Sequence, residues 1–169
     1  MNKRAHIMIG MAAGLIWAIG LLWAAATYVT LPVFTLMPTI MTAFLAPGLV
    51  MLLMVARLAQ RRFFDDAIID GGPLSGGAEI DQRVLRNTAE QLVLALCIWP
   101  ACAVLLTGQG PGVIMCLGLG FALARLVFWF GYHVAPPLRA FGFAASFYPT
   151  VLVAGWAIWR LASGNLLGQ

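Results

Sequence analysis

The chain has 169 residues, of which 62% are hydrophobic and 9% are charged; its net charge is +4 and its mean hydropathy is +0.93. A soluble domain carries about 25% charged residues, so this composition excludes a soluble globular domain and indicates an integral membrane protein. The basic residues lie at the ends of apolar segments and not along one amphipathic face, which argues against a nucleic-acid partner.

The first apolar segment, residues 7–29, follows the basic opening MNKRAH. A cleaved signal peptide is the alternative interpretation, with Ala24, Ala25 and Ala26 as the small residues before the cut. The apolar run is longer than the ~7–15 residues of a signal-peptide core, which favours a transmembrane helix. We therefore expect residues 1–35 to contain an additional N-terminal transmembrane helix.

Four more apolar segments follow, at residues 36–56, 87–107, 111–133 and 141–162. Each is close to the ~20 residues that a helix needs to cross the bilayer. Backbone groups in lipid must hydrogen-bond within the segment, which predicts helices. The expected fold is an all-α membrane protein with a four-helix domain at 36–162 and a short C-terminal tail at 163–169.

The connectors between these segments are short except the one at about 57–86. That connector contains the glycine-rich stretch GGPLSGG and is the only candidate for a functional loop outside the membrane. Its acidic residues Asp65, Asp66 and Asp70 are more typical of a solvated loop than of a metal site. In the last connector, HVAPPLRAF, Pro136 and Pro137 are expected to separate two helices.

The lysines and arginines predict the orientation in the membrane. With five spans, eight basic residues share one side: Lys3, Arg4, Arg57, Arg61, Arg62, Arg83, Arg86 and Arg139. Only Arg160 falls on the other side, and Arg125 lies within a span. The positive-inside rule places the N-terminus and the long connector in the cytoplasm and the C-terminus outside.

Polar residues inside the third and fourth apolar segments are the candidate functional residues. Arg83, Asn87 and Glu90 have the spacing i, i+4, i+7 and share one helix face. Arg125 and Tyr132 are seven residues apart on the next helix. At ~1.5 Å per residue, Glu90 lies roughly 9 Å and Arg125 roughly 13 Å from the cytoplasmic ends of their spans, so an ion pair between them is expected. Such a pair either fixes helix register or belongs to a functional site, and spacing alone leaves both open.

Two sequence motifs resemble one known family. RVLRNTAEQ resembles the Arg-x-x-x-Asn-x-x-Glu motif of the MAPEG superfamily, the membrane-associated proteins of eicosanoid and glutathione metabolism. ARLVFWFGYHVAPPLRAFGF resembles the next signature of that family, with Ala-Arg, an aromatic residue, Gly-Tyr, and an arginine seven residues after the tyrosine. The resemblance covers about residues 37–162. It suggests a bacterial-type member, in which the first helix is an addition to the usual four-helix unit.

The resemblance implies a homotrimer of four-helix units, with glutathione held between neighbouring subunits near the cytoplasmic side. The implied glutathione-binding residues are Arg83, Asn87, Glu90, Arg125 and Tyr132. Cationic guanidinium groups suit the two carboxylates of glutathione, and the Glu90 carboxylate suits its ammonium group. Arg139 matches the family arginine beside the sulfur, and a cation there favours the reactive thiolate. No metal is implied.

The motifs also depart from the family pattern at several donor positions, which here hold Ile80, Gln91, Val127, Phe128 and Val134. At Phe128 the family pattern has a tyrosine, so a hydroxyl is missing. The expected function is glutathione binding, with conjugation or reduction of lipophilic electrophiles as a transferase or peroxidase. The alternative is a non-catalytic member that binds lipid or serves as an accessory subunit of a membrane complex. A small transporter that uses Glu90 as a proton or cation site is a weaker hypothesis, because Arg83 and Arg125 lie close enough to neutralise it. The expected location is the bacterial inner membrane.

Overall fold

The computed structural model describes residues 3–164, so residues 165–169 of the expected C-terminal tail lie outside the described part. The described elements are α1 (Lys3–Tyr28), η1 (Val33–Thr35), α2 (Leu36–Ala43), α3 (Leu45–Phe63), α4 (Gly76–Leu105), η2 (Thr107–Gln109), α5 (Gly110–Val134) and α6 (Pro136–Ala162). Five helical stretches, counting α2 and α3 as one, are long and apolar enough to cross a membrane. This confirms the prediction of an all-α integral membrane protein.

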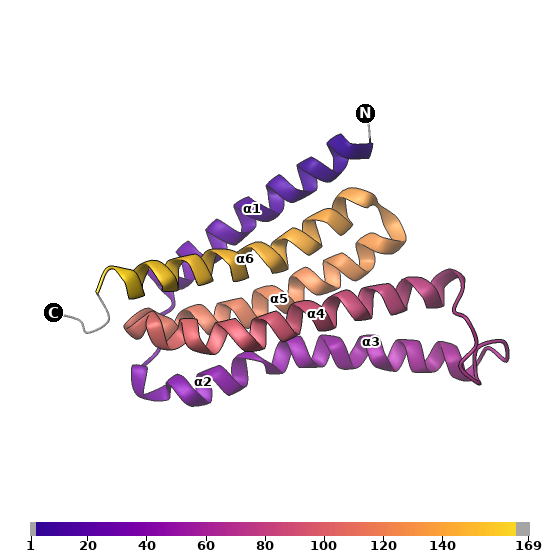
Figure 1. Ribbon diagram of the computed structural model, residues 1–169, viewed down its shortest axis with the longest axis horizontal. Helices are drawn as coiled ribbons and strands as arrows, with labels where there is room; N and C mark the ends of the chain where they lie inside the picture. Colours follow the sequence, from indigo (N-terminus) through magenta and orange to yellow (C-terminus); the bar gives the residue numbers. More distant parts are fainter. Residues whose placement is uncertain (1–2, 165–169) are drawn as a thin grey trace.

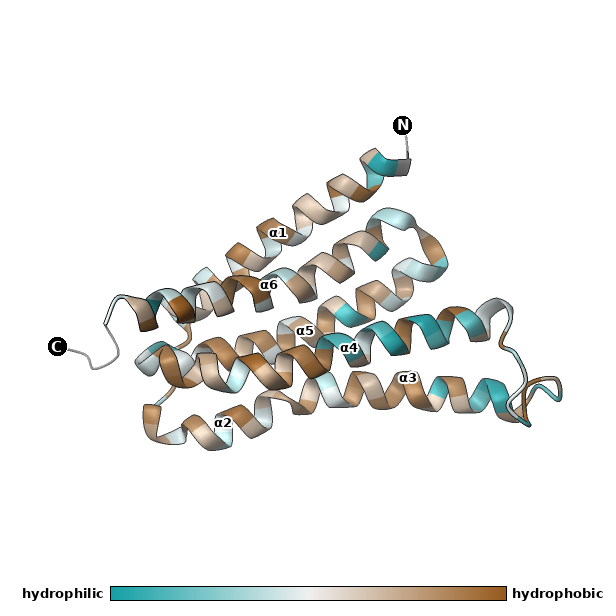
Figure 2. Cartoon of the chain, viewed as in Figure 1, coloured by the Kyte–Doolittle hydropathy of each residue, from teal (hydrophilic) through white to brown (hydrophobic). Residues whose placement is uncertain are grey.

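The helices run up and down beside one another, and α1 is inclined against α6 (Figure 1). The N-terminus, the α3–α4 connector and the α5–α6 turn lie at the same end of the bundle, on the right of Figure 1. We call this end, formed by residues near 3, 64–75 and 135, the loop end. Hydrophilic residues gather at the loop end of α3 and α4 (Figure 2), whereas the opposite half of the bundle is largely apolar.

The long connector is shorter than the sequence predicts. We expect a loop at about 57–86, but α3 continues to Phe63 and α4 already begins at Gly76, which leaves only residues 64–75 between them. The stretches that are helical instead, 57–63 and 76–86, contain five arginines, two glutamines and two leucines, which are good helix formers. Apolar length therefore marks the part of a helix that suits lipid, while the helix itself extends beyond it.

The α5–α6 connection also differs from the expected connector at 133–141. Ala135 alone separates the two helices, and Pro136 and Pro137 form the first turn of α6. Proline suits the first helical turn because its missing N–H would have no partner there. The extended backbone of Ala135 (φ −157°, ψ 137°) is typical of a residue before proline. Arg139 is thereby held next to the last turn of α5.

The second span is interrupted at Phe44, between α2 and α3. Pro47 has no N–H to donate to the carbonyl of Ala43, so the regular helical hydrogen-bond pattern cannot continue there. The same carbonyl oxygen lies against Gly118 of α5, where an added Cβ would be only 2.0 Å away. The break and the glycine together allow α2 and α5 to pack closely.

The first helix packs mainly against α6. An added Cβ at Gly10 would lie 2.4 Å from the carbonyl oxygen of Pro137, and one at Gly14 would lie 2.4 Å from the Cβ of Ala144. Further along the same face of α1, Ala18 and Ala25 are buried. Small residues thus let two membrane helices approach closely, as is common in membrane proteins.

Candidate functional site

Two cavities lie toward the loop end, and they share no lining residue. The first, which we call the Tyr132 cavity, has a volume of about 450 Å³ and is lined by Ile7, Met11, Asn87, Phe128, Tyr132, Arg139, Ala140 and Phe143. The second, which we call the Asp81 cavity, has a volume of about 500 Å³ and is lined by Arg57, Arg61, Asp81, Leu126, Trp129, Phe130 and His133. The Tyr132 cavity contains site residues that the sequence predicts, and the Asp81 cavity contains none of them.

The Tyr132 cavity brings together three of the predicted site residues. Asn87 comes from α4, Tyr132 from α5 and Arg139 from α6. The guanidinium carbon of Arg139 lies 5.0 Å from the centre of the Tyr132 ring, within the range of a cation–π contact. A cation, a phenol hydroxyl and an amide are thus available at one apolar-walled cavity.

Two glycines in the predicted motifs bring α5 and α6 into this contact. An added Cβ at Gly131 would lie 2.4 Å from the backbone nitrogen of Arg139, and one at Gly142 would lie 2.4 Å from the backbone nitrogen of Phe128. Any larger residue at either position would push the two helices apart. The glycines therefore fix the position of Tyr132 relative to Arg139.

Arg125 is fully buried and reaches the Tyr132 cavity only through Asn87. Its Nη1 and Nη2 donate hydrogen bonds of 2.9 and 3.1 Å to the Asn87 Oδ1. Its guanidinium carbon also lies 4.1 Å from the centre of the Phe128 ring. The Nε of Arg125 has no hydrogen-bond partner within residues 3–164. No carboxylate of the described chain neutralises this cation.

The expected ion pair between Glu90 and Arg125 is therefore not formed within the described chain. Glu90 follows Asn87 by three residues, which turns its side chain about 60° around the helix. Asn87 faces α5, while Glu90 is exposed on the outside of the bundle and forms no ion pair with any described residue. The rotation about α4, which an estimate of depth in the membrane does not reveal, separates Glu90 from Arg125.

Arg83 lies on the outside of α4 as well. Its side chain is 63% exposed, and its Nη2 donates a 2.5 Å hydrogen bond to Oε1 of Glu79 one turn earlier. Exposed pairs of this kind contribute little to stability. Arg83 and Glu90 thus do not line the Tyr132 cavity of their own chain. The predicted residues are divided between the cavity, the buried Arg125 behind it, and this outer face.

One departure from the expected donors affects the cavity directly. Phe128 is 3% exposed and packs edge-on against Tyr132, with ring centres 5.1 Å apart. An apolar ring therefore lies where the resemblance leads us to expect a hydroxyl. It lines the cavity and lies against the buried guanidinium of Arg125.

Comparison with known proteins gives one decisive match. The model of the MAPEG family matches residues 35–159, well over half of the chain. The chain belongs to the MAPEG family. The resemblance predicted from the two motifs is thus confirmed, and α1 precedes the matched residues. No curated protein and no solved structure matches the chain significantly.

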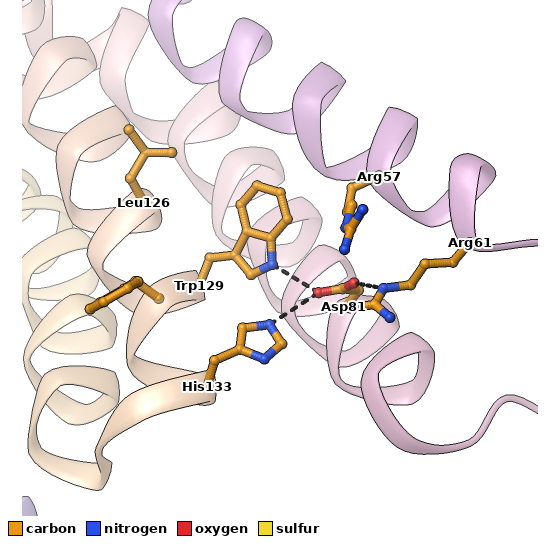
Figure 3. A pocket seen from close by; sticks show the side chains of 7 residues that line it. Arg57, Arg61, Asp81, Leu126, Trp129 and His133 are labelled. Carbon is orange, nitrogen blue, oxygen red and sulfur yellow. Dashed lines mark hydrogen bonds and ion pairs between the residues drawn. The ribbon is translucent and has the colours of Figure 1, made fainter.

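The Asp81 cavity of this MAPEG protein was missed by the sequence analysis. Asp81 is 2% exposed and accepts a hydrogen bond of 2.5 Å from Arg61 Nε and one of 2.9 Å from Trp129 Nε1. Its Oδ1 also lies 3.3 Å from Nε2 of His133. Figure 3 shows the carboxylate between these three side chains, which come from α3 and α5.

A weak signal for this cluster is present in the sequence. Trp129 and His133 have the spacing i, i+4 on α5, so their two nitrogen-containing rings lie on one face of the helix. Their acceptor, however, lies 48 residues from Trp129 and 52 from His133, and no local pattern connects them. The sequence pattern alone therefore predicts no role for His133. The described residues contain no group of three or more His, Cys, Asp or Glu side chains that could hold a metal ion.

Proposed function

We propose that this MAPEG protein binds glutathione in the Tyr132 cavity and presents the sulfur to lipophilic electrophiles that enter from the membrane. One observation carries the proposal: Asn87, Tyr132 and Arg139, which the motifs assign to glutathione, come from three helices and line one cavity. A cavity that combines apolar walls with a few convergent polar groups is the usual form of a small-molecule site.

The geometry suggests a role for each of these residues. The Arg139 cation stabilises a thiolate beside it, and the Tyr132 hydroxyl donates a hydrogen bond to the sulfur or to a carboxylate. Arg125 occupies the amide oxygen of Asn87, which leaves the NH₂ group of that amide free to donate to a glutathione carboxylate. Arg125 is thus a positioning residue that orients Asn87.

We further propose that the protein is a homotrimer in which α4 of one subunit completes the site of its neighbour. Glu90 is an exposed carboxylate on a helix apolar enough to cross a membrane, and such a group needs a counter-charge or a polar partner. A neighbouring subunit and bound glutathione would supply both. Native mass spectrometry in mild detergent is expected to give a trimer, and a spectrum with only monomer or dimer would contradict the shared site.

The proposed location is a bacterial inner membrane with the loop end in the cytoplasm. Support comes from the eight basic residues on that side against Arg160 on the other. Cysteines introduced at Ser75 and Ser163, in a background without native cysteines, test the orientation. We expect an impermeant thiol reagent to label the Ser163 site from outside, and labelling of the Ser75 site from outside would overturn the proposal.

A second candidate function is a non-catalytic MAPEG protein that binds lipid or acts as an accessory subunit. The observation in its favour is Phe128, a buried ring without the hydroxyl that the family signature provides. We expect glutathione to bind through Asn87, Tyr132 and Arg139. We expect its conjugation to be slow because the hydroxyl is missing at Phe128.

Calorimetry with glutathione tests the main proposal. The wild-type protein is expected to give a heat of binding. Arg139→Ala is expected to weaken binding by about tenfold or more, because it removes a charge-assisted contact. The matched control is Arg160→Ala, which removes an arginine at the opposite end that donates to Gln109. Absence of glutathione binding in the folded wild-type protein would favour the lipid or accessory role. Fast conjugation by the wild-type protein that disappears in Arg139→Ala would show that the protein is an efficient enzyme.

A further inference from the structure

The wall of the Tyr132 cavity includes two residues from outside the part of the chain that matches the MAPEG family. Ile7 and Met11 of α1 line the cavity together with residues of α4, α5 and α6. The match begins at residue 35, after α1 has ended at Tyr28. The predicted glutathione residues thus share their cavity with a helix that lies outside the residues matched by the family model.

The position of α1 on the bundle is well defined. Gly10 and Gly14 pack directly on Pro137 and Ala144 of α6, so α1 cannot slide without a clash or a gap. One turn further on, Trp17 packs edge-on against Phe141, with ring centres 6.4 Å apart. Ile7 and Met11 flank the Gly10 contact, so their backbone positions beside the cavity are fixed, while the Met11 side chain is 39% exposed.

The lining of the cavity divides into polar and apolar residues. Asn87, Tyr132 and Arg139 supply the polar groups, and the apolar residues are Ile7, Met11, Phe128, Ala140 and Phe143. The proposed function places the sulfur of glutathione beside Arg139. Ala140, the neighbour of Arg139 in the chain, lies 3.0 Å from the Cβ that a side chain at Gly10 would have. A group attached to the sulfur would therefore enter the space that Ile7 and Met11 bound.

We propose that α1 sets the size of the apolar group that this site accepts, with Met11 and Ile7 as the residues that limit it. The ligand class is a glutathione thioether, or an electrophile that forms one, with a short to medium apolar chain. The inference rests on the proposed glutathione binding. It adds that a helix outside the residues matched by the family model acts as a specificity element.

The test measures the affinity of the full-length protein for S-methylglutathione, S-hexylglutathione and S-decylglutathione by calorimetry. Met11→Trp fills the apolar space. We expect it to lower the affinity for S-hexylglutathione about tenfold relative to the affinity for S-methylglutathione, which is the effect of displacing one or two methylene groups from an apolar pocket. Met11→Ala enlarges the space and is expected to shift the preference toward S-decylglutathione. The matched control is Met8→Trp, because Met8 lies on the same helix but is 67% exposed and does not line the cavity.

Each outcome supports or overturns the inference. A change of preference in both Met11 variants but not in Met8→Trp supports it. An unchanged preference in variants that still bind S-methylglutathione overturns it and leaves glutathione binding intact. The same change in Met8→Trp also overturns it, because the effect would then not come from the cavity. If wild type binds neither glutathione nor its thioethers, the proposed function fails, and this inference fails with it.

Discussion

The two cavities at the loop end share α4 and α5, but α3 completes the Asp81 cavity while α1 and α6 complete the Tyr132 cavity, and the two differ in how their charges are paired. In the Asp81 cavity the buried Asp81 carboxylate accepts hydrogen bonds from Arg61 and Trp129 and contacts His133. At the Tyr132 cavity, neither Arg139, which lines it, nor Arg125, which is buried behind Asn87, has a carboxylate partner within residues 3–164. Arg125 donates hydrogen bonds to the amide oxygen of Asn87, and Arg139 lies over the Tyr132 ring.

This difference separates a structural cluster from a candidate binding site. A buried charge with several good partners holds helices together and leaves little capacity for a ligand. Cations with incomplete partners leave hydrogen-bonding capacity for an anionic ligand. We therefore interpret Asp81 as a clamp between α3, α4 and α5, and the Tyr132 cavity as the place where an anion such as glutathione would complete the hydrogen bonding.

The largest expected effect is on the clamp. Asp81→Ala removes the acceptor shared by Arg61, Trp129 and His133, and we expect it to lower the free energy of unfolding by about 2–4 kcal/mol. Thermal unfolding in detergent measures the loss. Asp81→Asn retains the shape and one acceptor oxygen and is expected to lose less. A stable Asp81→Ala protein with weakened glutathione binding would reverse the two roles, since it would place ligand binding at the Asp81 cavity.

A smaller effect is expected where Asn87 serves Arg125. Asn87→Ala leaves a fully buried guanidinium without its acceptor and should cost about 1.5–3 kcal/mol of unfolding free energy. Adding Arg125→Met should recover part of this cost, because a buried charge can be replaced by an apolar side chain of similar size. A double-mutant cycle by denaturant unfolding gives the coupling. Purely additive costs would show that Asn87 does not hold Arg125.

The sequence predicts the fold better than the site. Apolar length and the need for internal hydrogen bonds are sufficient to predict membrane helices, and the two motifs are sufficient to place the chain in the MAPEG family. Helix ends were less predictable: α4 begins at Gly76 because charged residues can continue a helix beyond the lipid-compatible part.

Within the site, local spacing identified the helix face but not what that face contacts. The resemblance implies one site for Asn87 and Arg125, and in the structure Arg125 donates hydrogen bonds to the Asn87 Oδ1. The spacing i, i+4, i+7 does not distinguish the inward Asn87 from the outward Glu90. The two side chains differ by a rotation of about 60° around α4, and residues with this spacing share a face only approximately. Asp81 was missed because its partners lie 20 to 52 residues away and form no motif.

The smallest effect on the isolated subunit is expected from Glu90→Gln, which removes the charge and keeps the shape. Were Glu90 paired with Arg125, as the sequence suggested, its loss would strand a buried cation and cost about 3–5 kcal/mol. Since Glu90 is exposed in the structure, we expect the unfolding free energy of the monomer in a dissociating detergent to change by less than about 0.5 kcal/mol.

In mild detergent the same variant should bind glutathione more weakly and dissociate more readily into monomers. There the proposed partners of Glu90, a neighbouring subunit and the ammonium group of the ligand, are present. The measurements are unfolding in both detergents, native mass spectrometry and calorimetry. The matched control is Glu79→Gln, which removes a half-exposed carboxylate from the same helix by breaking only its surface pair with Arg83. A large loss of stability in the monomer would support the Glu90–Arg125 ion pair and its role in fixing helix register. An unchanged trimer with full glutathione affinity would exclude the outer face of α4 from the site.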